Sequence, residues 1–483
     1  MDGPAISRNA ARRLRRRQES RLQAAAADAV RTVRAERPQA LDLAAEAGSL
    51  LLSNGAAAAE IVDTVMDICA SAGLPDVNVV VTYDQVTLAV QPEAGGEAHA
   101  RIAAVRSRAY NFGRYATTVA VVRRYLRDEI TAGQALAEVR GLRTARLQPL
   151  WVTRVAAGVT GFSAGIVFGA SPYVAVLAFV AVLFSDWLGG ILTGRRWPGF
   201  FVQMVVGAIA VGVAVVGLRI DPEVDVSAVI VAVIIVALAG MTVTGAVQDA
   251  ITGWYLTGSV RVFEALIKSL GLVVGIKAAV MVADRIGVEG LVLYDFTERP
   301  LDPTLMVLAS GVLVLSFSLT TQMPWRGVAT SAAIGMGGYL THSLMTGTGV
   351  WASGVAAVVV GVLAASLARW VRIPVSALTN AAVLPLLPGV ALFQGLITTT
   401  DYVVAGITGL ATAMTIALTL AVGMTLGGHL VAVLTERWRD HDDRLYVPYF
   451  SEPVATLRER DAFLNRRGRP SDDASEDESA STR

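Results

Sequence analysis

The sequence predicts a polytopic α-helical membrane protein that carries an α+β domain on its N-terminal side. Of its 483 residues, 54% are apolar and only 17% are charged, a composition too apolar for an ordinary soluble enzyme. The charged residues collect in the first 150 and the last 50 positions. Between them, apolar runs recur that can cross about 30 Å of hydrocarbon with about 20 residues each.

The N-terminal segment is basic. Residues 1–37 form an arm that contains six arginines between Arg8 and Arg17, and anionic lipid headgroups would attract such a segment. A disordered tail is an equally good interpretation of the same composition. The arm lacks the apolar core of a secretory signal peptide, so we expect this end to stay in the cytoplasm.

Residues 38–148 are predicted to form a cytoplasmic α+β domain. Apolar residues at helical spacing from Leu41 to Leu51 stop at Asn54-Gly55, and a second helical pattern runs from Ile61 to Ile68. Further along, the pattern predicts strands at 77–82 and 86–90, a third strand near 101–106, and a return to helix at 115–128.

About ten apolar segments are predicted to cross the membrane, five in a first half at residues 149–300 and five in a second half at 301–436. They lie near 151–169, 173–192, 199–217, 226–244, 260–283, 304–321, 327–343, 350–368, 374–396 and 402–430. The remaining residues, 437–483, are predicted to form a cytoplasmic tail that is acidic and disordered at its end.

The charges of the short loops predict how the spans are oriented. If the N-terminus is cytoplasmic, the arginine-rich loops fall on the cytoplasmic side, as the positive-inside rule requires. These loops contain Arg195-Arg196, Arg261, Arg326, Arg369 with Arg372, and Arg437 with Arg439. The opposite loops are mostly acidic, at 221–225 and 284–302, or uncharged. Both termini are therefore predicted to be cytoplasmic.

An internal repeat is predicted to relate the two halves. Three matches keep their order at a displacement of about 150 residues: Ser171-Pro172 with Met323-Pro324, 205–207 with 359–361, and 238–240 with 387–389. Because five spans is an odd number, the two copies would be inverted in the membrane. Chance matches among abundant valines, glycines and alanines are the alternative.

Ionisable residues in the spans are the first functional candidates, because each costs about 2.5 to 3.5 kcal/mol to insert. Asp186, about two turns before Arg195, could bind a proton or a substrate amine; capping a helix or pairing with an arginine is the structural alternative. Asp249 could cap the next helix or bind an ammonium group. Lys268 stands four residues after Glu264, so an ion pair is its simpler role.

Uncharged polar residues occupy comparable positions in the second half. Asn380 and Gln394 could hydrogen-bond a polar solute, or only neighbouring helices. Many transporters bind their substrates near the membrane midplane at interrupted helices. The predicted helix breaks lie at Gly240, Gly245, Pro385, Pro388 and Gly389.

Several chemistries are not indicated. The sequence contains no Walker loop, no His-Glu-x-x-His pattern and no Gly-x-Ser-x-Gly motif. Four histidines and one cysteine leave little scope for a metal centre, so we expect neither a metal nor another cofactor. The net charge of +1 does not indicate nucleic-acid binding.

From about Leu41 to His429 the chain resembles the bacterial threonine/serine exporters. In the α+β domain the resemblance is carried by the segments LAAEAG at 43–48, SNGA at 53–56 and EIVDTVM at 60–66. In the membrane part it is carried by 240–249 with Gly253 and by 387–389. The family pattern at the first break looks like Pro-Gly, and this chain departs from it with Ala239 in place of the proline.

The resemblance implies a non-enzymatic secondary transporter of the bacterial inner membrane that exports threonine and serine by antiport with protons. A homodimer in the lipid bilayer is left open. One alternative is an exporter of another small solute such as a dicarboxylate, because fold alone does not give the substrate. The other is a membrane-anchored enzyme or sensor that acts through residues 38–148.

Overall fold

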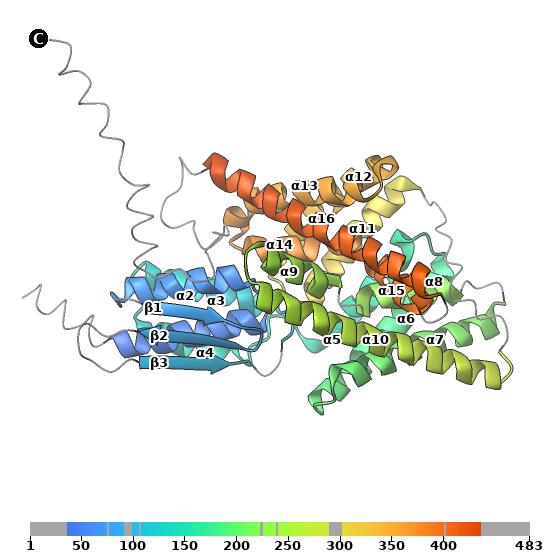
Figure 1. Cartoon of the computed structure of the whole chain (residues 1–483), viewed down its shortest axis with the longest axis horizontal. Coiled ribbons are helices and arrows are strands. Elements are labelled where there is room, and N and C mark those ends of the chain that lie inside the picture. Colours follow the sequence, from blue (N-terminus) through green and yellow to red (C-terminus); the bar gives the residue numbers. More distant parts are fainter. Residues whose placement is uncertain are drawn as a thin grey trace, which may run out of the picture.

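The computed structural model describes residues 36–74, 77–90, 99–105, 108–222, 226–237, 240–288, 302–399 and 402–435. These residues form an N-terminal α+β domain and a larger helical part that lies beside it (Figure 1). The predicted basic arm up to residue 35 and the predicted tail lie outside the described residues.

The α+β domain contains a three-stranded antiparallel sheet. β1 (Val77–Val81), β2 (Gln85–Val90) and β3 (His99–Ala104) pair in the order β1-β2-β3. Val86, Leu88 and Val90 of β2 are buried in alternation, which is the pattern of a strand with one face on a core. The third strand begins two residues before its predicted start.

Helices complete the domain. They are a helix over residues 36–53, α2 (Ala58–Ser71), α3 (Phe112–Leu126) and α4 (Ala132–Leu142). α2 packs against β1 and α3, and α3 packs against α4. The first three agree with the predicted helical segments. α4 was not predicted, although Thr131 and Gln134 form a capping box that marks its start.

The helical part contains long apolar helices. Seven described helices are long and apolar enough to cross a membrane, and a bent pair would add an eighth. The seven are α5 (Leu150–Val167), α6 (Pro172–Gly194), α7 (Gly199–Ile220), α10 (Tyr255–Arg285), α11 (Pro303–Thr320), α13 (Val350–Val371) and α16 (Val403–Thr435). α12 (Trp325–Leu344) packs against both α11 and α13.

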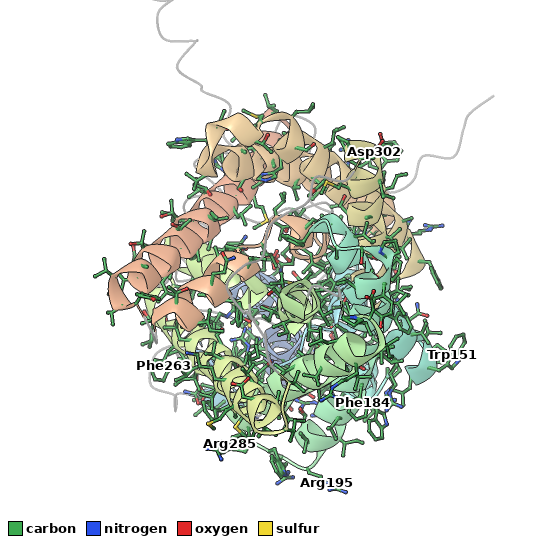
Figure 2. The ribbon with its side chains drawn as sticks, turned by 90° about the vertical axis from the view of Figure 1, so that its right-hand side faces the viewer. Trp151, Phe184, Arg195, Phe263, Arg285 and Asp302 are labelled. Carbon is green, nitrogen blue, oxygen red and sulfur yellow. The ribbon has the colours of Figure 1, made fainter. Side chains whose placement is uncertain are left out.

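Large apolar side chains cover the outer surface of the helical part. Phe184, Val216 and Phe263 are 45%, 58% and 66% exposed. Figure 2 shows Phe184, Phe263 and Trp151 pointing outward from the ribbon. An exposed apolar surface of this extent needs lipid around it, so the helical part is suited to a bilayer.

Two of the predicted spans are represented by more than one helix. The fourth contains α8 (Val226–Ala237) and α9 (Gly240–Ile251), with residues 238–239 between them outside the described residues. The ninth consists of α14 (Val375–Ala382), the 3-10 turn η2 (Leu384–Leu386) and α15 (Gly389–Thr399), with a bend of 46°. Pro385 lies in η2 and Pro388 precedes α15. Because proline has no backbone N–H, neither residue can continue the hydrogen bonding of a helix.

Gly245 lies inside α9, which begins at Gly240, and it does not break this helix. The prediction of a break at Gly245 is therefore wrong. A glycine inside a helix costs only about 1 kcal/mol relative to alanine, a penalty that tertiary packing can overcome.

Glycines bring α7 and α10 into backbone contact. A Cβ on Gly271 of α10 would overlap the carbonyl oxygen of Phe200, and one on Gly275 would overlap that of Met204, both on α7. Small residues four apart commonly let membrane helices approach this closely.

The same arrangement joins α13 and α16. A Cβ on Gly423 of α16 would lie 2.5 Å from the carbonyl oxygen of Gly354, and one on Gly427 would overlap that of Val358, both on α13. The two glycine pairs occupy the last long helix of each predicted half.

We expect Gly275→Val to destabilise the full-length protein, because its side chain would force α7 and α10 apart. Overpacking of this kind costs about 1 to 3 kcal/mol, or more where backbone is in the way. Gly212→Val on α7 is the control, since a Cβ there meets nothing within 4 Å. Thermal unfolding in one detergent measures both variants, and equal melting temperatures would contradict the close approach.

Candidate functional site

A cavity of about 490 Å³ opens among α5, α6, α7 and α8 and the end of α11. Apolar side chains such as Val206 and Val233 form much of its wall. Its polar lining residues are Thr160, Ser185, Asp186, Thr193, Gln203 and Thr320. A concave site with apolar walls and a few polar groups is the usual form of a small-molecule binding site.

α6 supplies one wall of the cavity. Ser185, Gly189 and Thr193 are four residues apart, as are Asp186 and Gly190, so all five lie on one side of the helix. The two glycines leave space beside the polar groups. A Cβ at Gly190 would meet no atom within 4 Å.

Two buried polar atoms in the cavity wall have no hydrogen-bond partner among the described residues. They are the hydroxyl of Ser185 and the amide oxygen of Gln203. Gln203 Nε2 donates to the carbonyl oxygen of Ala237 on α8 at 3.2 Å. Because an unsatisfied buried group costs about 1 to 3 kcal/mol, this wall favours a ligand that forms hydrogen bonds.

Asp186 lies at the open side of this cavity. Its side chain is exposed in the isolated protein and makes no hydrogen bond or salt bridge with another described residue. Arg154 of α5 attracts it electrostatically. Of the two structural alternatives for Asp186, helix capping is not seen among the described residues, and pairing with an arginine is present only as this longer-range attraction.

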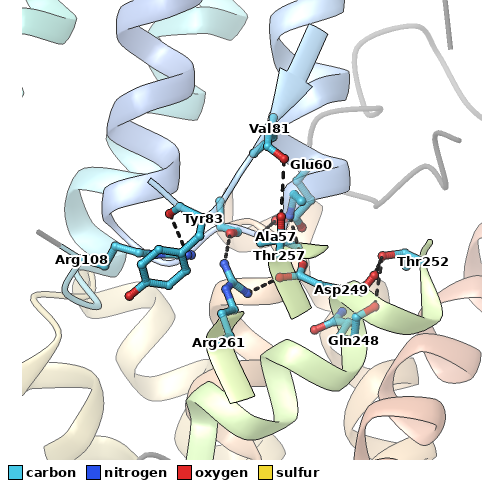
Figure 3. Close-up of polar contacts among 12 residues, drawn as sticks. Ala57, Glu60, Val81, Tyr83, Arg108, Gln248, Asp249, Thr252, Thr257 and Arg261 are labelled. Atoms are coloured by element: carbon cyan, nitrogen blue, oxygen red, sulfur yellow. Dashed lines mark hydrogen bonds and ion pairs between the residues drawn. The ribbon is translucent and has the colours of Figure 1, made fainter. Parts of the chain in front are cut away.

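Asp249 lies away from the cavity, at the boundary with the α+β domain (Figure 3). It is fully buried. Its Oδ1 accepts a hydrogen bond from the N–H of Ala58 at 3.2 Å, and its Oδ2 pairs with Nη1 of Arg261 at 2.6 Å. Arg261 also donates to the carbonyl oxygen of Ala56 at 3.3 Å.

This geometry gives Asp249 a role that differs from the predicted one. Ala58 is the first residue of α2, so Asp249 caps the N-terminus of a helix in the other domain, 191 residues away in sequence. The expectation that it caps the next helix is wrong. α10 follows it without a side-chain cap.

A second polar contact joins the α+β domain to α14. Oε2 of Glu60 accepts hydrogen bonds from the hydroxyl of Tyr115 at 2.5 Å and from that of Ser376 at 2.9 Å. Burial raises the pKa of Glu60, although the hydrogen bonds from Tyr115 and Ser376 act in the opposite direction. Sequence reasoning missed this site, because Glu60 and Ser376 are 316 positions apart in the sequence and no local motif connects them.

The other candidate residues lie elsewhere. Lys268 pairs with Glu264 at 2.7 Å across one helical turn, as its spacing predicts. Asn380 on α14 and Gln394 on α15 are half-buried, and neither is among the described residues that line the cavity. Of the five candidate side chains, the structure places only Asp186 there. Within the described part of the chain, no cluster of three or more potential metal ligands occurs.

Apolar helices of membrane-spanning length define a multi-pass membrane protein, and the cavity with polar groups among them is the kind of site that a transporter uses. The chain belongs to the threonine/serine exporter family. A family model described as "Putative threonine/serine exporter" matches residues 42–283, and one described as "Threonine/Serine exporter, ThrE" matches residues 306–429.

Two relatives support this assignment. The chain is 30% identical to "Probable threonine/serine exporter" of Mycobacterium tuberculosis over 410 residues, which cover 82% of this chain and 77% of the relative. It is 29% identical to "Threonine/serine exporter" of Corynebacterium glutamicum over 276 residues, which cover 55% and 56% of the two chains. No solved structure matches the chain.

We expect Asp249→Ala to destabilise the full-length protein by about 3 to 5 kcal/mol, because it leaves the buried charge of Arg261 uncompensated. Replacing both partners, by Asp249→Ala with Arg261→Leu, should restore part of this loss. The control is Asp42→Ala, which breaks an exposed ion pair with Arg101 and should cost less than about 1 kcal/mol. Unfolding by titration with a denaturing detergent measures all three, and a similar small loss in Asp249→Ala and Asp42→Ala would contradict a buried docking contact.

Proposed function

We propose that this protein exports threonine and serine across the cytoplasmic membrane as a secondary transporter, and that the cavity beside Asp186 is the substrate site. The observation that carries this proposal is the pairing of an acidic side chain with unsatisfied hydroxyl and amide groups in one cavity. Family membership and the names of both relatives support the same substrates.

The cavity matches the chemistry of a small hydroxylated amino acid. The carboxylate of Asp186 attracts an ammonium group. Ser185 and Gln203 can hydrogen-bond the substrate hydroxyl. A dicarboxylate is disfavoured here, since its negative charges would face that of Asp186.

Two inverted halves of five spans each would provide alternating access to this site. Support comes from the interrupted ninth span and from the glycine pairs. Gly271 and Gly275 recur as Gly423 and Gly427, 152 residues later. In this scheme α8 with α9, and α14 with α15, each count as one span, which gives ten.

The charges near the α+β domain support its location on the cytoplasmic side. The turn between α11 and α12 lies against the domain, because Gln322 Oε1 accepts hydrogen bonds from the N–H groups of Leu147 and Gln148 at 2.8 and 2.9 Å. Arg326 follows this turn, with the exposed Trp325 beside it. Arginine and tryptophan at this position are typical of the cytoplasmic membrane interface.

Asp186 is the side chain that we assign to proton coupling. A carboxylate at the open side of the cavity can exchange its proton with either side of the membrane as the cavity changes its exposure. Protonation would remove the charge that holds the substrate ammonium, so proton uptake and substrate release would be linked.

We expect Asp186→Asn to abolish threonine export driven by a pH gradient, because the amide cannot carry the proton. Exchange of labelled for unlabelled threonine without a gradient should be retained in part, since the hydrogen-bonding lining remains. Proteoliposomes loaded with labelled threonine measure both processes. Gradient-driven export at the unmodified rate would exclude Asp186 from coupling.

We expect Gly190→Leu to block export while leaving folding intact, because the new side chain enters open space in the cavity. Gly212→Leu on α7 is the matched control, with equal freedom for a Cβ but no place in the cavity lining. Export rates and melting temperatures are compared in parallel. Undiminished export by Gly190→Leu would place the substrate path elsewhere.

A further inference from the structure

A second, smaller pocket lies between the α+β domain and the helical part. It has a volume of about 110 Å³, and we call it the interface pocket. A buried water needs only about 10 to 15 Å³ on the same measure, so the pocket has room for a small organic molecule. Its lining residues are Gly55, Arg108, Ala109, Tyr110, Thr242, Arg261, Glu264 and Lys268.

The interface pocket has an uncompensated positive charge. Arg261 is paired with Asp249, and Lys268 is paired with Glu264. Arg108 has no carboxylate partner among the described residues: its Nη1 donates to the carbonyl oxygen of Tyr83 at 3.3 Å, and its guanidinium lies over the Tyr83 ring at 5.0 Å (Figure 3). Burial and the nearby Arg261 lower the pKa of Arg108 to about 10, so it remains a cation at neutral pH.

The interface pocket also contains a carboxylate. Glu264 lines it, near the side chain of Tyr83. A guanidinium with free donors and a carboxylate on the opposite element are the two groups that recognise the ends of a zwitterion. Arginine is well suited to the anionic end, because its planar fork matches a carboxylate.

The interface pocket and the substrate cavity are lined by neighbouring parts of the same predicted span. Ala237 of α8 lines the cavity, and Thr242, in the first turn of α9, lines the interface pocket. The two sites are therefore connected by a short stretch of chain.

We propose that the interface pocket binds the free amino acid before it enters the cavity, with the substrate carboxylate on Arg108 and the ammonium group at Glu264. This inference rests on the proposed export function. It gives the α+β domain a direct part in substrate recognition, because Arg108 and Tyr110 belong to that domain, whereas Glu264 belongs to α10.

Cysteine labelling of the full-length protein tests this assignment. Ala109 lines the pocket and is exposed, so an Ala109→Cys variant should react with a maleimide. The single native cysteine, Cys69, is buried, which raises its pKa to about 12 and keeps it unreactive. Threonine and serine should slow the labelling of Ala109→Cys, and the concentration for half-maximal protection gives the affinity.

Variants identify the groups responsible. Adding Arg108→Gln should raise the half-protecting threonine concentration about tenfold or more, since a charge-assisted hydrogen bond to the carboxylate is lost, whereas Arg108→Lys should retain part of the affinity. Arg101→Gln, which changes an exposed arginine of the same domain, should have no effect. An Ala100→Cys variant on β3, also exposed, should label at a rate that threonine does not change.

Two outcomes of the labelling experiment would overturn the proposal. Protection by inorganic phosphate but not by threonine would overturn the proposal and assign the pocket to a lipid headgroup. Labelling that threonine leaves unchanged, at concentrations that saturate export, would also overturn it.

The proposed function can fail separately. Protection by threonine without any export would reject the transport function and keep the binding site, whereas export without protection would reject the interface pocket alone. Asp186→Asn serves as a check, because it should lose gradient-driven export and keep the threonine protection of Ala109→Cys.

Discussion

The buried ion pair between Asp249 and Arg261 is the charged contact at the centre of the boundary between the α+β domain and the helical part. Asp249 satisfies the N-terminus of α2, while Arg261 donates to the carbonyl oxygen of Ala56 just before that helix. A buried pair of this kind tolerates the loss of neither partner. The N-terminal end of α2, which packs on the sheet, is therefore held by two residues of the membrane part.

The same domain holds two short helices of the membrane part. Asp249 lies near the C-terminal end of α9, and Ser376, which donates to Glu60, lies near the start of α14, before the break at η2. Each of these short helices thus has the α+β domain at one end. A shift of the domain would move both helices together, and α8, which precedes α9 in the chain, lines the cavity at Ala237.

Local patterns predicted the elements well, and long-range contacts escaped them. The apolar runs anticipated the long helices, and Pro385 with Pro388 marked an interruption because proline cannot continue a helical ladder. Asp186 could be selected because a carboxylate at membrane depth needs a reason. The partners of Asp249 and Glu60 could not be predicted, since they lie 191 and 316 residues away and only the folded chain brings them together. The prediction at Gly245 was wrong for another reason, because a glycine in the sequence does not show whether packing keeps the helix around it intact.

The length of α10 has a consequence for the lipid around the protein. Its 31 residues extend about 46 Å, whereas about 20 residues suffice to cross the hydrocarbon. The first turns reach the α+β domain, where the hydroxyl of Thr257 donates to the carbonyl oxygen of Val81 at 3.4 Å. A helix longer than the bilayer is thick accommodates a change of thickness by tilting. A change in bilayer thickness would therefore be transmitted along α10 to the sheet. Lipid composition would in this way act on the position of the domain without any lipid molecule binding to the domain.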